Sequence, residues 1–183
     1  MRLPNLRLLR AAALRPALFE EVASDDDAII EALGVFTIAA GIMSWGIAVK
    51  AGMPREWQSF DWAYYMCIVF ATVFLGWCFW VNLICAKLLA QRSAFRRTLR
   101  AAAYGAVPLV GYAFSAIPGM DFAMTLVPAW LLVAQFLAVR AAQRIGNGAT
   151  FLCFVAAVPL TAITTSYFGT SAGLGLGFIP GLK

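Results

Sequence analysis

Histidine is absent from this sequence, and charge is scarce, since Asp, Glu, Lys and Arg make up only 13% of the 183 residues. The first absence removes the commonest metal ligand and general base. The second excludes an ordinary soluble domain, in which about a quarter of the residues are charged. The hydrophobic fraction of 62% is also too high for a chain of this length to bury in one aqueous core. Lipid is therefore the predicted solvent for most of the chain.

Cysteine is present four times, and each copy lies inside an apolar run. This placement disfavours a disulfide framework. The axial rises between Cys67, Cys78 and Cys85 along one helix are too long for joint metal coordination, so a packing role is predicted for them. No zinc-protease motif, phosphate-binding loop or CxxC pair is present. We therefore expect no cofactor, no metal and no enzymatic activity.

Five apolar segments stand out, each close to the ~20 residues that cross a ~30 Å hydrocarbon layer. They are residues 28–49, 62–86, 98–117, 121–139 and 149–168. They are apolar on all sides rather than along one stripe, which favours membrane helices over an antiparallel soluble bundle. The predicted fold is an all-α integral membrane bundle of five transmembrane helices.

The sequence predicts three regions. Residues 1–27 form a cytoplasmic, interfacial amphipathic segment, residues 28–168 the five-helix transmembrane domain, and residues 169–183 a Gly-rich apolar tail. Within the first region, one helical face is predicted to contain Leu3, Leu6, Leu9 and Ala13, with the arginines directed at lipid headgroups. Pro16 is expected to start a second short helix, and the stretch SDDD at residues 24–27 is expected to cap the first crossing.

Basic residues are distributed unevenly between the loops. With five crossings, the N-terminus, the second loop and the fourth loop share one side, and eleven of the fourteen basic residues lie there. The positive-inside rule then places the N-terminus in the cytoplasm and the C-terminus on the outer side of the cell inner membrane. The net charge of +5 is the excess expected of loops that face anionic lipid, so no nucleic-acid partner is expected.

Proline occurs near the middle of three of the five segments. Pro108 has no N–H to donate to the carbonyl of Tyr104, so we expect a helix kink at this pair, which neighbouring helices in lipid tolerate. Pro128 and Pro159 repeat the feature in the next two segments. Kinked helices leave a second function open, because they are suited to line the path of a small channel or transporter.

The stretches FRRTLRAAAYGAVPLV (95–110) and VPAWLLVAQFLAVRAA (127–142), approached through RPALFEEVASDDDAIIEALGVF (15–36), resemble the prokaryotic branch of the Ypt-interacting-protein (YIP) membrane family. The resemblance implies five helices and a cytoplasmic N-terminus. For eukaryotic members it implies work with Rab-type GTPases, vesicle budding and organelle shape. This chain lacks the acidic DLYGP-like segment that those relatives carry before the first crossing, which weighs against GTPase binding.

The first apolar segment carries small residues at a fixed spacing. Gly34, Gly41 and Ala48 recur every seven residues, which suits close contact with another helix, within one protomer or between two. Glu31 lies one turn inside the same segment, and no acidic residue lies deeper in any of the five. Because proton-coupled transport usually uses an ionisable group near mid-membrane, this weakens the transporter alternative.

Polar residues inside the segments are candidate sites because they are costly in lipid. Asn82, Tyr104 and Gln135 all fall in the cytoplasmic half, and we predict that they form a polar cluster near the Tyr104 carbonyl. The alternative is that Asn82 and Gln135 each hydrogen-bond a neighbouring helix as structural contacts.

Three arginines precede or open the third segment. Arg96, Arg97 and Arg100 are predicted to contact anionic lipid or a protein partner, with topology anchoring as the alternative. The function expected from the whole sequence is that of a non-enzymatic membrane protein that organises the bilayer or partner proteins. Its expected partners are membrane lipids together with a protein partner or a second copy of the chain.

Overall fold

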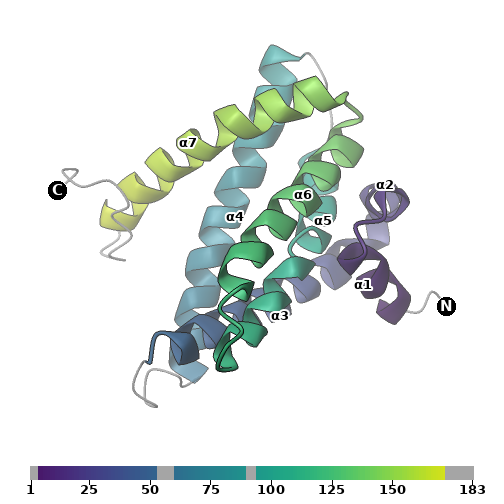
Figure 1. Ribbon diagram of the computed structural model, residues 1–183. Coiled ribbons are helices and arrows are strands. Elements are labelled where there is room, and N and C mark those ends of the chain that lie inside the picture. Colours follow the sequence, from purple (N-terminus) through teal and green to yellow (C-terminus); the bar gives the residue numbers. More distant parts are fainter. Residues whose placement is uncertain (1–3, 53–59, 90–93, 172–183) are drawn as a thin grey trace.

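The computed structural model describes residues 4–52, 60–89 and 94–171, and every regular element in these ranges is a helix (Figure 1). Two short helices and a 3₁₀ turn come first: α1 (Pro4–Ala12), α2 (Pro16–Ser24) and η1 (Asp26–Ala28). The later elements are α3 (Ile29–Lys50), α4 (Phe60–Leu88), α5 (Phe95–Tyr104), the 3₁₀ helix η3 (Val107–Ala116), α6 (Ala123–Gln143) and α7 (Asn147–Ser171). The all-α prediction is confirmed for this part of the chain.

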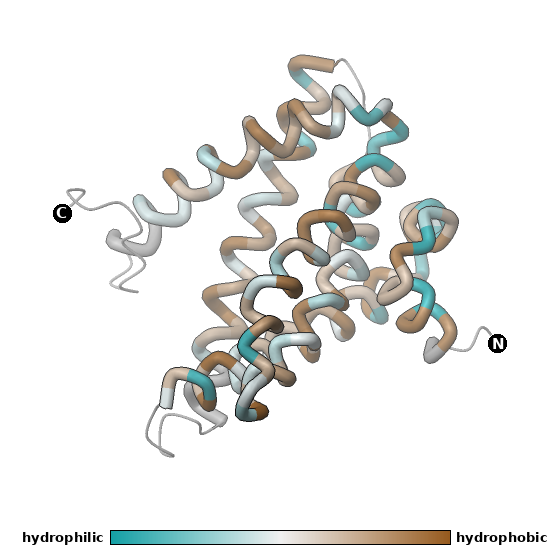
Figure 2. Tube along the Cα trace, in the orientation of Figure 1, coloured by the Kyte–Doolittle hydropathy of each residue, from teal (hydrophilic) through white to brown (hydrophobic). Residues whose placement is uncertain are grey.

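Four of these helices are long and apolar enough to cross a membrane, namely those over residues 26–50, 65–88, 123–143 and 147–167. Their outer surfaces carry large apolar side chains: Ile30, Phe79 and Phe151 are 81%, 53% and 64% exposed. A soluble bundle would hide most such side chains, so this surface is compatible with a multi-pass membrane protein. In Figure 2 the apolar colour runs along the long helices, and hydrophilic stretches gather around α1, α2 and the helix ends.

The third apolar segment, predicted as one helix over residues 98–117, is not a continuous α-helix. α5 ends at Tyr104, and the chain continues as η3, with Pro108 near its start. Because Pro108 cannot donate to the Tyr104 carbonyl, the α-helical bond pattern has no continuation at this point. The predicted kink is therefore a change from α- to 3₁₀-helix. Pro128 and Pro159, in contrast, lie inside α6 and α7, which continue past them.

η3 lies closely against the C-terminal half of α3. A Cβ placed on Gly46 would be 2.3 Å from the carbonyl oxygen of Tyr112, which is a steric clash. Glycine, which has no Cβ, is therefore required at this position. The Ser115 hydroxyl donates to the Gly46 carbonyl at 3.3 Å. Of the predicted small-residue positions, Ala48 is fully buried and a Cβ on Gly41 would lie 3.8 Å from the Cys67 sulfur of α4. Among the described residues nothing lies within 4 Å of a Cβ on Gly34, and the closest backbone approach occurs at Gly46, which was not predicted.

α1 and α2 form a hairpin. Pro16 starts α2, as predicted. α1 ends in a Schellman turn, in which the N–H of Arg15 donates to the carbonyl of Arg10 at 3.0 Å and Leu14 adopts a positive φ of 53°.

The predicted cap at residues 24–27 is wrong. Neither η1 nor α3 has a side-chain hydrogen bond at its N-cap. The carboxylates of Asp25 and Asp26 accept hydrogen bonds from Arg7 and Arg100 instead. Each of these bonds joins two opposite charges and includes a buried guanidinium that needs an acceptor, which favours it over a cap of the helix N–H groups.

α2 packs into the bundle. Its residues Leu18, Phe19 and Val22 are fully buried and share one core cluster with Phe36 of α3 and Tyr104 of α5. Burial of each such large apolar side chain stabilises the packing by about 1.5–3 kcal/mol. The hairpin is thereby fixed to the end of the bundle at which α3 and α5 begin, which we call the N-terminal end.

α7 is the last described element. It packs against α4, with Trp77 of α4 and Phe154 of α7 in edge-to-face contact at a centroid distance of 5.3 Å. In Figure 1 its C-terminal half leans away from α3 and α6. The predicted tail over residues 169–183 begins within this helix, and residues 172–183 lie outside the described residues.

Candidate functional site

The three arginines predicted as one contact surface point in different directions. Arg96 is exposed, Arg97 is partly buried and Arg100 is 1% exposed. The Arg100 guanidinium donates to the Asp26 carboxylate and to the Ala23 carbonyl, each at 2.7 Å. Arg100 is therefore not part of a lipid or partner surface, because its charge is used inside the fold.

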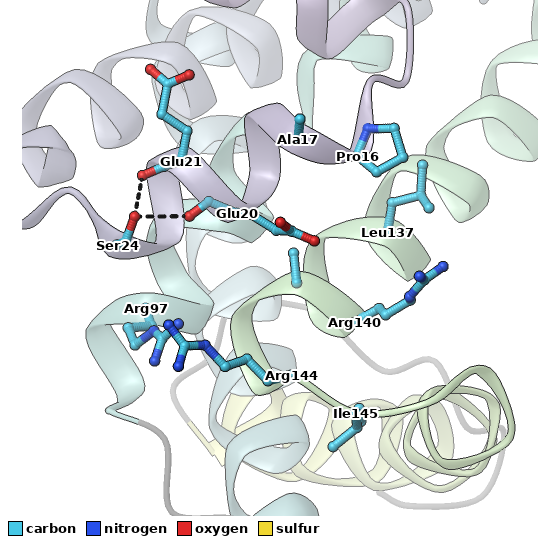
Figure 3. Close-up of a pocket in the computed structure, with 11 residues that line it drawn as sticks. Pro16, Ala17, Glu20, Glu21, Ser24, Arg97, Leu137, Arg140, Arg144 and Ile145 are labelled. Atoms are coloured by element: carbon cyan, nitrogen blue, oxygen red, sulfur yellow. Dashed lines mark hydrogen bonds between the residues drawn. The ribbon is translucent and has the colours of Figure 1, made fainter.

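A cleft of about 700 Å³ lies at the N-terminal end, between α2 and α6 (Figure 3). Arg97 reaches it from α5, and Arg140 and Arg144 reach it from the last turn and the C-cap of α6. Glu20 and Glu21 lie on its α2 side. The remaining wall is mainly apolar and contains Pro16, Ala17, Leu137, Ala141 and Ile145. The cleft thus combines three guanidinium groups with an apolar floor.

The charge of these three arginines is not neutralised within the fold. In residues 4–52, 60–89 and 94–171, no carboxylate forms an ion pair with Arg97, Arg140 or Arg144. The Nε of Arg97 is buried and has no acceptor in the same ranges. Burial, and then repulsion from Arg144 and Arg100, lowers the pKa of Arg97. Arg140 and Arg144 are exposed to solvent, so the cost of unpaired charge in the cleft falls mainly on Arg97.

The two acidic residues on the α2 side differ in their roles. Glu21 accepts hydrogen bonds from Arg10 at 2.9 Å and from Arg7 at 3.1 Å, and in Figure 3 its side chain turns away from the cleft. The Glu20 carboxylate instead projects toward α6. Glu20 faces the arginines and Asp26 also attracts Arg97, so among the described residues two carboxylates act on three arginines and the cleft keeps a positive excess.

A buried ionic network lies beside the cleft and holds α1 to the bundle. The Arg7 side chain is 6% exposed and donates to Glu21, to Asp25 at 2.7 Å and to Glu31 at 3.0 Å. Burial alone would lower the pKa of Arg7, but its hydrogen bonds to Asp25 and Glu21 outweigh burial and raise it. The arginine therefore stays charged, and its three partners join α1 to α2 and α3.

Tyr104 joins the same network from α5. It is fully buried, and its hydroxyl donates to the carboxylate of Glu31, the residue that also accepts from Arg7. Tyr104 therefore contributes its side-chain hydroxyl at the N-terminal end of the bundle. This is separate from its backbone carbonyl, to which Pro108 cannot donate.

The predicted cluster of Asn82, Tyr104 and Gln135 is not formed. The Gln143 amide donates to Asn82 at 3.3 Å and to Thr98 at 2.7 Å. The Gln135 amide donates to the Ala102 carbonyl at 3.0 Å. Each residue thus bonds a different neighbour, because α4 and α6 present Asn82 and Gln135 at different heights along α5. The alternative prediction, separate structural contacts between helices, matches this geometry.

Cys85 of α4 and Cys153 of α7 are fully buried, with their sulfur atoms 3.1 Å apart in a thiol hydrogen bond. Cys78 is buried elsewhere in α4, within a separate core cluster. The thiols therefore fill helix contacts, and α7 supplies a partner that spacing along α4 alone does not indicate.

Sequence reasoning missed the residues that organise this end of the molecule. Arg7 was expected to face headgroups, yet its partners lie up to 24 residues away in the chain. Arg140 and Arg144 contributed only to the orientation rule. Arg144 lies at the C-cap of α6, where the chain has left the helix, so their four-residue spacing gives no signal for the approach of Arg144 to Arg97.

One spacing used by enzymes does occur, G-x-S-x-G at residues 169–173. In hydrolases it forms a strand-to-helix turn and works with a histidine. The chain has no histidine, and Gly169 and Ser171 belong to α7 rather than to a strand-to-helix turn. No known protein family, curated protein or solved structure matches this chain.

Proposed function

We propose that this chain is a non-enzymatic, five-crossing membrane protein that organises the cytoplasmic leaflet, or partner proteins at it, through its N-terminal hairpin. One observation carries the proposal: α1 turns Leu6 and Leu9 outward and Arg7 inward. Leu6 and Leu9 are 56% and 67% exposed, whereas Arg7 is 5% exposed. In water the opposite arrangement is favoured, so the outer face of α1 is suited to the acyl boundary of a membrane.

Five crossings are supported by the path of the third segment. Arg100 at its start bonds Asp26 at the start of α3, and Asp121 just beyond its end forms an ion pair with Lys50 at the end of α3. The segment therefore runs beside α3 over the full length of that helix. The seven α-helical residues from Thr98 to Tyr104 and the ten 3₁₀ residues of η3 together span about 30 Å, which matches a ~30 Å hydrocarbon layer.

The proposed orientation follows from charge. The cleft arginines and the hairpin lie at the N-terminal end, so the positive-inside rule supports a cytoplasmic N-terminus and an outer C-terminus in the cell inner membrane. The same layout supports membership of the YIP family as a proposal. GTPase binding is not part of the proposal, because the acidic segment before the first crossing is absent.

The test uses the full chain in liposomes of phosphatidylcholine and phosphatidylglycerol, whose shape is followed by electron cryomicroscopy. The double variant Leu6→Ser/Leu9→Ser makes the outer face of α1 polar, and Leu6→Met/Leu9→Met is the matched control that keeps it apolar. We expect the wild type and the methionine variant to alter liposome shape and the serine variant not to. Wild-type liposomes shaped like protein-free ones, with no stoichiometric protein retained during purification in nanodiscs, would contradict the proposal.

A second candidate function, a small channel or transporter, is favoured by one cavity. It measures about 460 Å³ and lies among α3, α4, η3, α6 and α7. Its few polar lining residues are Gln135, Thr161 and Thr165. Because the remaining wall is apolar, this cavity suits a path for small uncharged solutes better than one for ions. Solute flux across liposomes that keep their shape would favour this function over the first.

A further inference from the structure

We propose that the cleft between α2 and α6 is a binding site for one phosphate group, held by Arg97 and Arg144. This inference rests on the proposed function in one respect, namely that the N-terminal end faces the cytoplasmic membrane surface. The phosphate belongs either to the headgroup of an anionic phospholipid or to a soluble phosphorylated molecule. Both sources present the same chemistry to the cleft, and the experiment below separates them.

Two guanidinium groups approach each other in the cleft. Arg144 reaches it from the C-cap of α6 and Arg97 from α5, whereas the Arg140 side chain points away from both (Figure 3). In Figure 3 the Arg144 side chain extends toward Arg97, and the repulsion between these two groups agrees with their closeness. Planar guanidinium groups bind phosphate oxygens through paired hydrogen bonds, which makes arginine the side chain best suited to this ligand.

The charge of the cleft also favours an anionic ligand. Like charges at close range oppose one another, and a bound anion replaces that repulsion with attraction. The nearby acidic residues compete little, because Glu21 is engaged by Arg7 and Arg10 on the side away from the cleft. Of the two described glutamates that line the cleft, Glu20 is the one whose carboxylate faces the arginines. A ligand with at least one full negative charge is therefore favoured.

The size and lining of the cleft suit an organic ligand. A cavity of about 700 Å³ is of the size that accommodates a small organic ligand. Its apolar wall, which includes Leu137 and Ile145, lies next to the arginines. A bare ion would leave this wall uncovered, whereas the glycerol and first acyl carbons of a phospholipid would cover it. The lining therefore favours the lipid source.

The backbone conformation of Arg144 is unusual for an arginine. This residue has φ 54° and ψ 42°, the left-handed conformation that glycine adopts most easily at a helix C-terminus. An arginine here has a backbone strain that glycine would not have, as has Leu14 at the end of α1. The position also provides a variant that removes the guanidinium while relieving the strain.

The experiment measures lipid retention by native mass spectrometry of the full chain released from nanodiscs of phosphatidylcholine with a minority of phosphatidylglycerol. Single variants Arg97→Gln and Arg144→Gly are compared with Lys87→Gln, an exposed basic residue in the last turn of α4 that does not line the cleft. We expect each cleft variant to retain phosphatidylglycerol at least tenfold less than the wild type. Lys87→Gln is expected to retain it as the wild type does.

The second arm uses nanodiscs of phosphatidylcholine alone and adds inorganic phosphate or glycerol 3-phosphate while thermal unfolding is followed. A rise in the wild-type melting temperature that the cleft variants lack, without selective retention of phosphatidylglycerol, assigns the site to a soluble phosphorylated molecule. Selective retention without this rise assigns it to lipid. Equal behaviour of the wild type and all cleft variants in both arms overturns the inference.

Arg144→Gly guards against a trivial loss through unfolding, because its melting temperature in phosphatidylcholine nanodiscs is expected to equal or exceed that of the wild type. The liposome-shape assay with the Leu6 and Leu9 variants is independent of these readouts. Failure of phosphate binding with intact shaping activity would therefore remove this inference alone. Phosphate binding without shaping activity would remove the proposed function and keep the site.

Discussion

The guanidinium of Arg100 donates to the carboxylate of Asp26 at 2.7 Å, and the two partners of this ion pair are in very different surroundings. The Arg100 side chain is 2% exposed, whereas that of Asp26 is 93% exposed. Arg100 also donates to the Ala23 carbonyl at 2.7 Å. The arginine therefore links α5 to the junction between α2 and α3. The aspartate accepts its bond while its side chain remains in solvent.

This asymmetry predicts unequal costs for removing either partner. Asp26→Asn is expected to lower the free energy of unfolding by no more than about 1 kcal/mol, because the solvated Asp26 contributes little and the asparagine carbonyl oxygen can still accept the bond from Arg100. Arg100→Met is expected to lower it by about 1.5–3 kcal/mol, because the Ala23 carbonyl then loses a charged donor. Reversible unfolding in mixed micelles measures both. Equal losses in the two variants would contradict the proposed division of roles.

The positions of the long helices could be predicted from the sequence because lipid imposes one strong rule, a continuous apolar run. The first expected crossing, residues 28–49, corresponds to α3 at Ile29–Lys50. The third expected crossing differed because its local bonding is set at Pro108, where the α-helical pattern has no donor. A proline identifies a disturbance, but whether the chain bends or changes to a 3₁₀ helix depends on neighbours such as Gly46.

The candidate site was harder to predict because its charges pair across the fold. The sequence shows that Arg7 lies on an amphipathic helix, but the side on which the arginine lies is decided by Glu21, Asp25 and Glu31 once α1 folds back on α2. Likewise, Arg97 and Arg144 meet only after α5 and α6 pack together. Such pairings depend on tertiary geometry and have no signal in periodicity.

Tyr104 provides a test of the buried network. Tyr104→Phe removes the hydroxyl that donates to Glu31 and keeps the ring. We expect a loss of about 1.5–3 kcal/mol in unfolding free energy, the range for a hydrogen bond to a charged group. Tyr112→Phe is the matched control, because the hydroxyl of Tyr112 has no hydrogen-bond partner among the described residues. Similar stability of the two variants would show that the Tyr104–Glu31 bond contributes little.

Acid is expected to loosen the N-terminal hairpin. Burial alone would raise the pKa of Glu21, but hydrogen bonds from Arg10 and Arg7 outweigh it and hold the pKa below its ordinary value of 4.5. A depressed folded-state pKa contributes stability above the unfolded value, and this contribution is lost as the pH falls through the folded value. We therefore expect the hydrogen-exchange protection factors of α1 to be constant from neutral pH down to about 4.5 and to fall below it.

The control for this pH dependence is chosen within α2. Glu21→Gln should show low protection of α1 even at neutral pH and little further change in acid. Glu20→Gln should keep the wild-type profile, since Glu20 takes no part in the Arg7 and Arg10 bonds. A wild-type profile that is flat to about pH 3, or one shared with Glu21→Gln, would contradict this role for Glu21.

The contact between α3 and η3 depends on one glycine. A Cβ on Gly46 would lie 2.3 Å from the oxygen and 2.8 Å from the carbon of the Tyr112 carbonyl, which belong to backbone and cannot rotate away. Gly46→Ala is therefore expected to lower the unfolding free energy by about 1–3 kcal/mol, the range for overpacking. Gly34→Ala, on the same helix with nothing described within 4 Å of its Cβ, is expected to raise it by about 0.5–1 kcal/mol.

The comparison of these two alanines, by unfolding in the same micelles, also tests the third crossing. If η3 lies along α3, only the alanine at Gly46 separates the two elements, and hydrogen exchange should increase in η3 without a matching change in α6. If both alanines are stabilising, η3 does not approach α3 at Tyr112. The third segment would then lack the contact that carries it to the far end of α3, because Ser115 could no longer reach the Gly46 carbonyl.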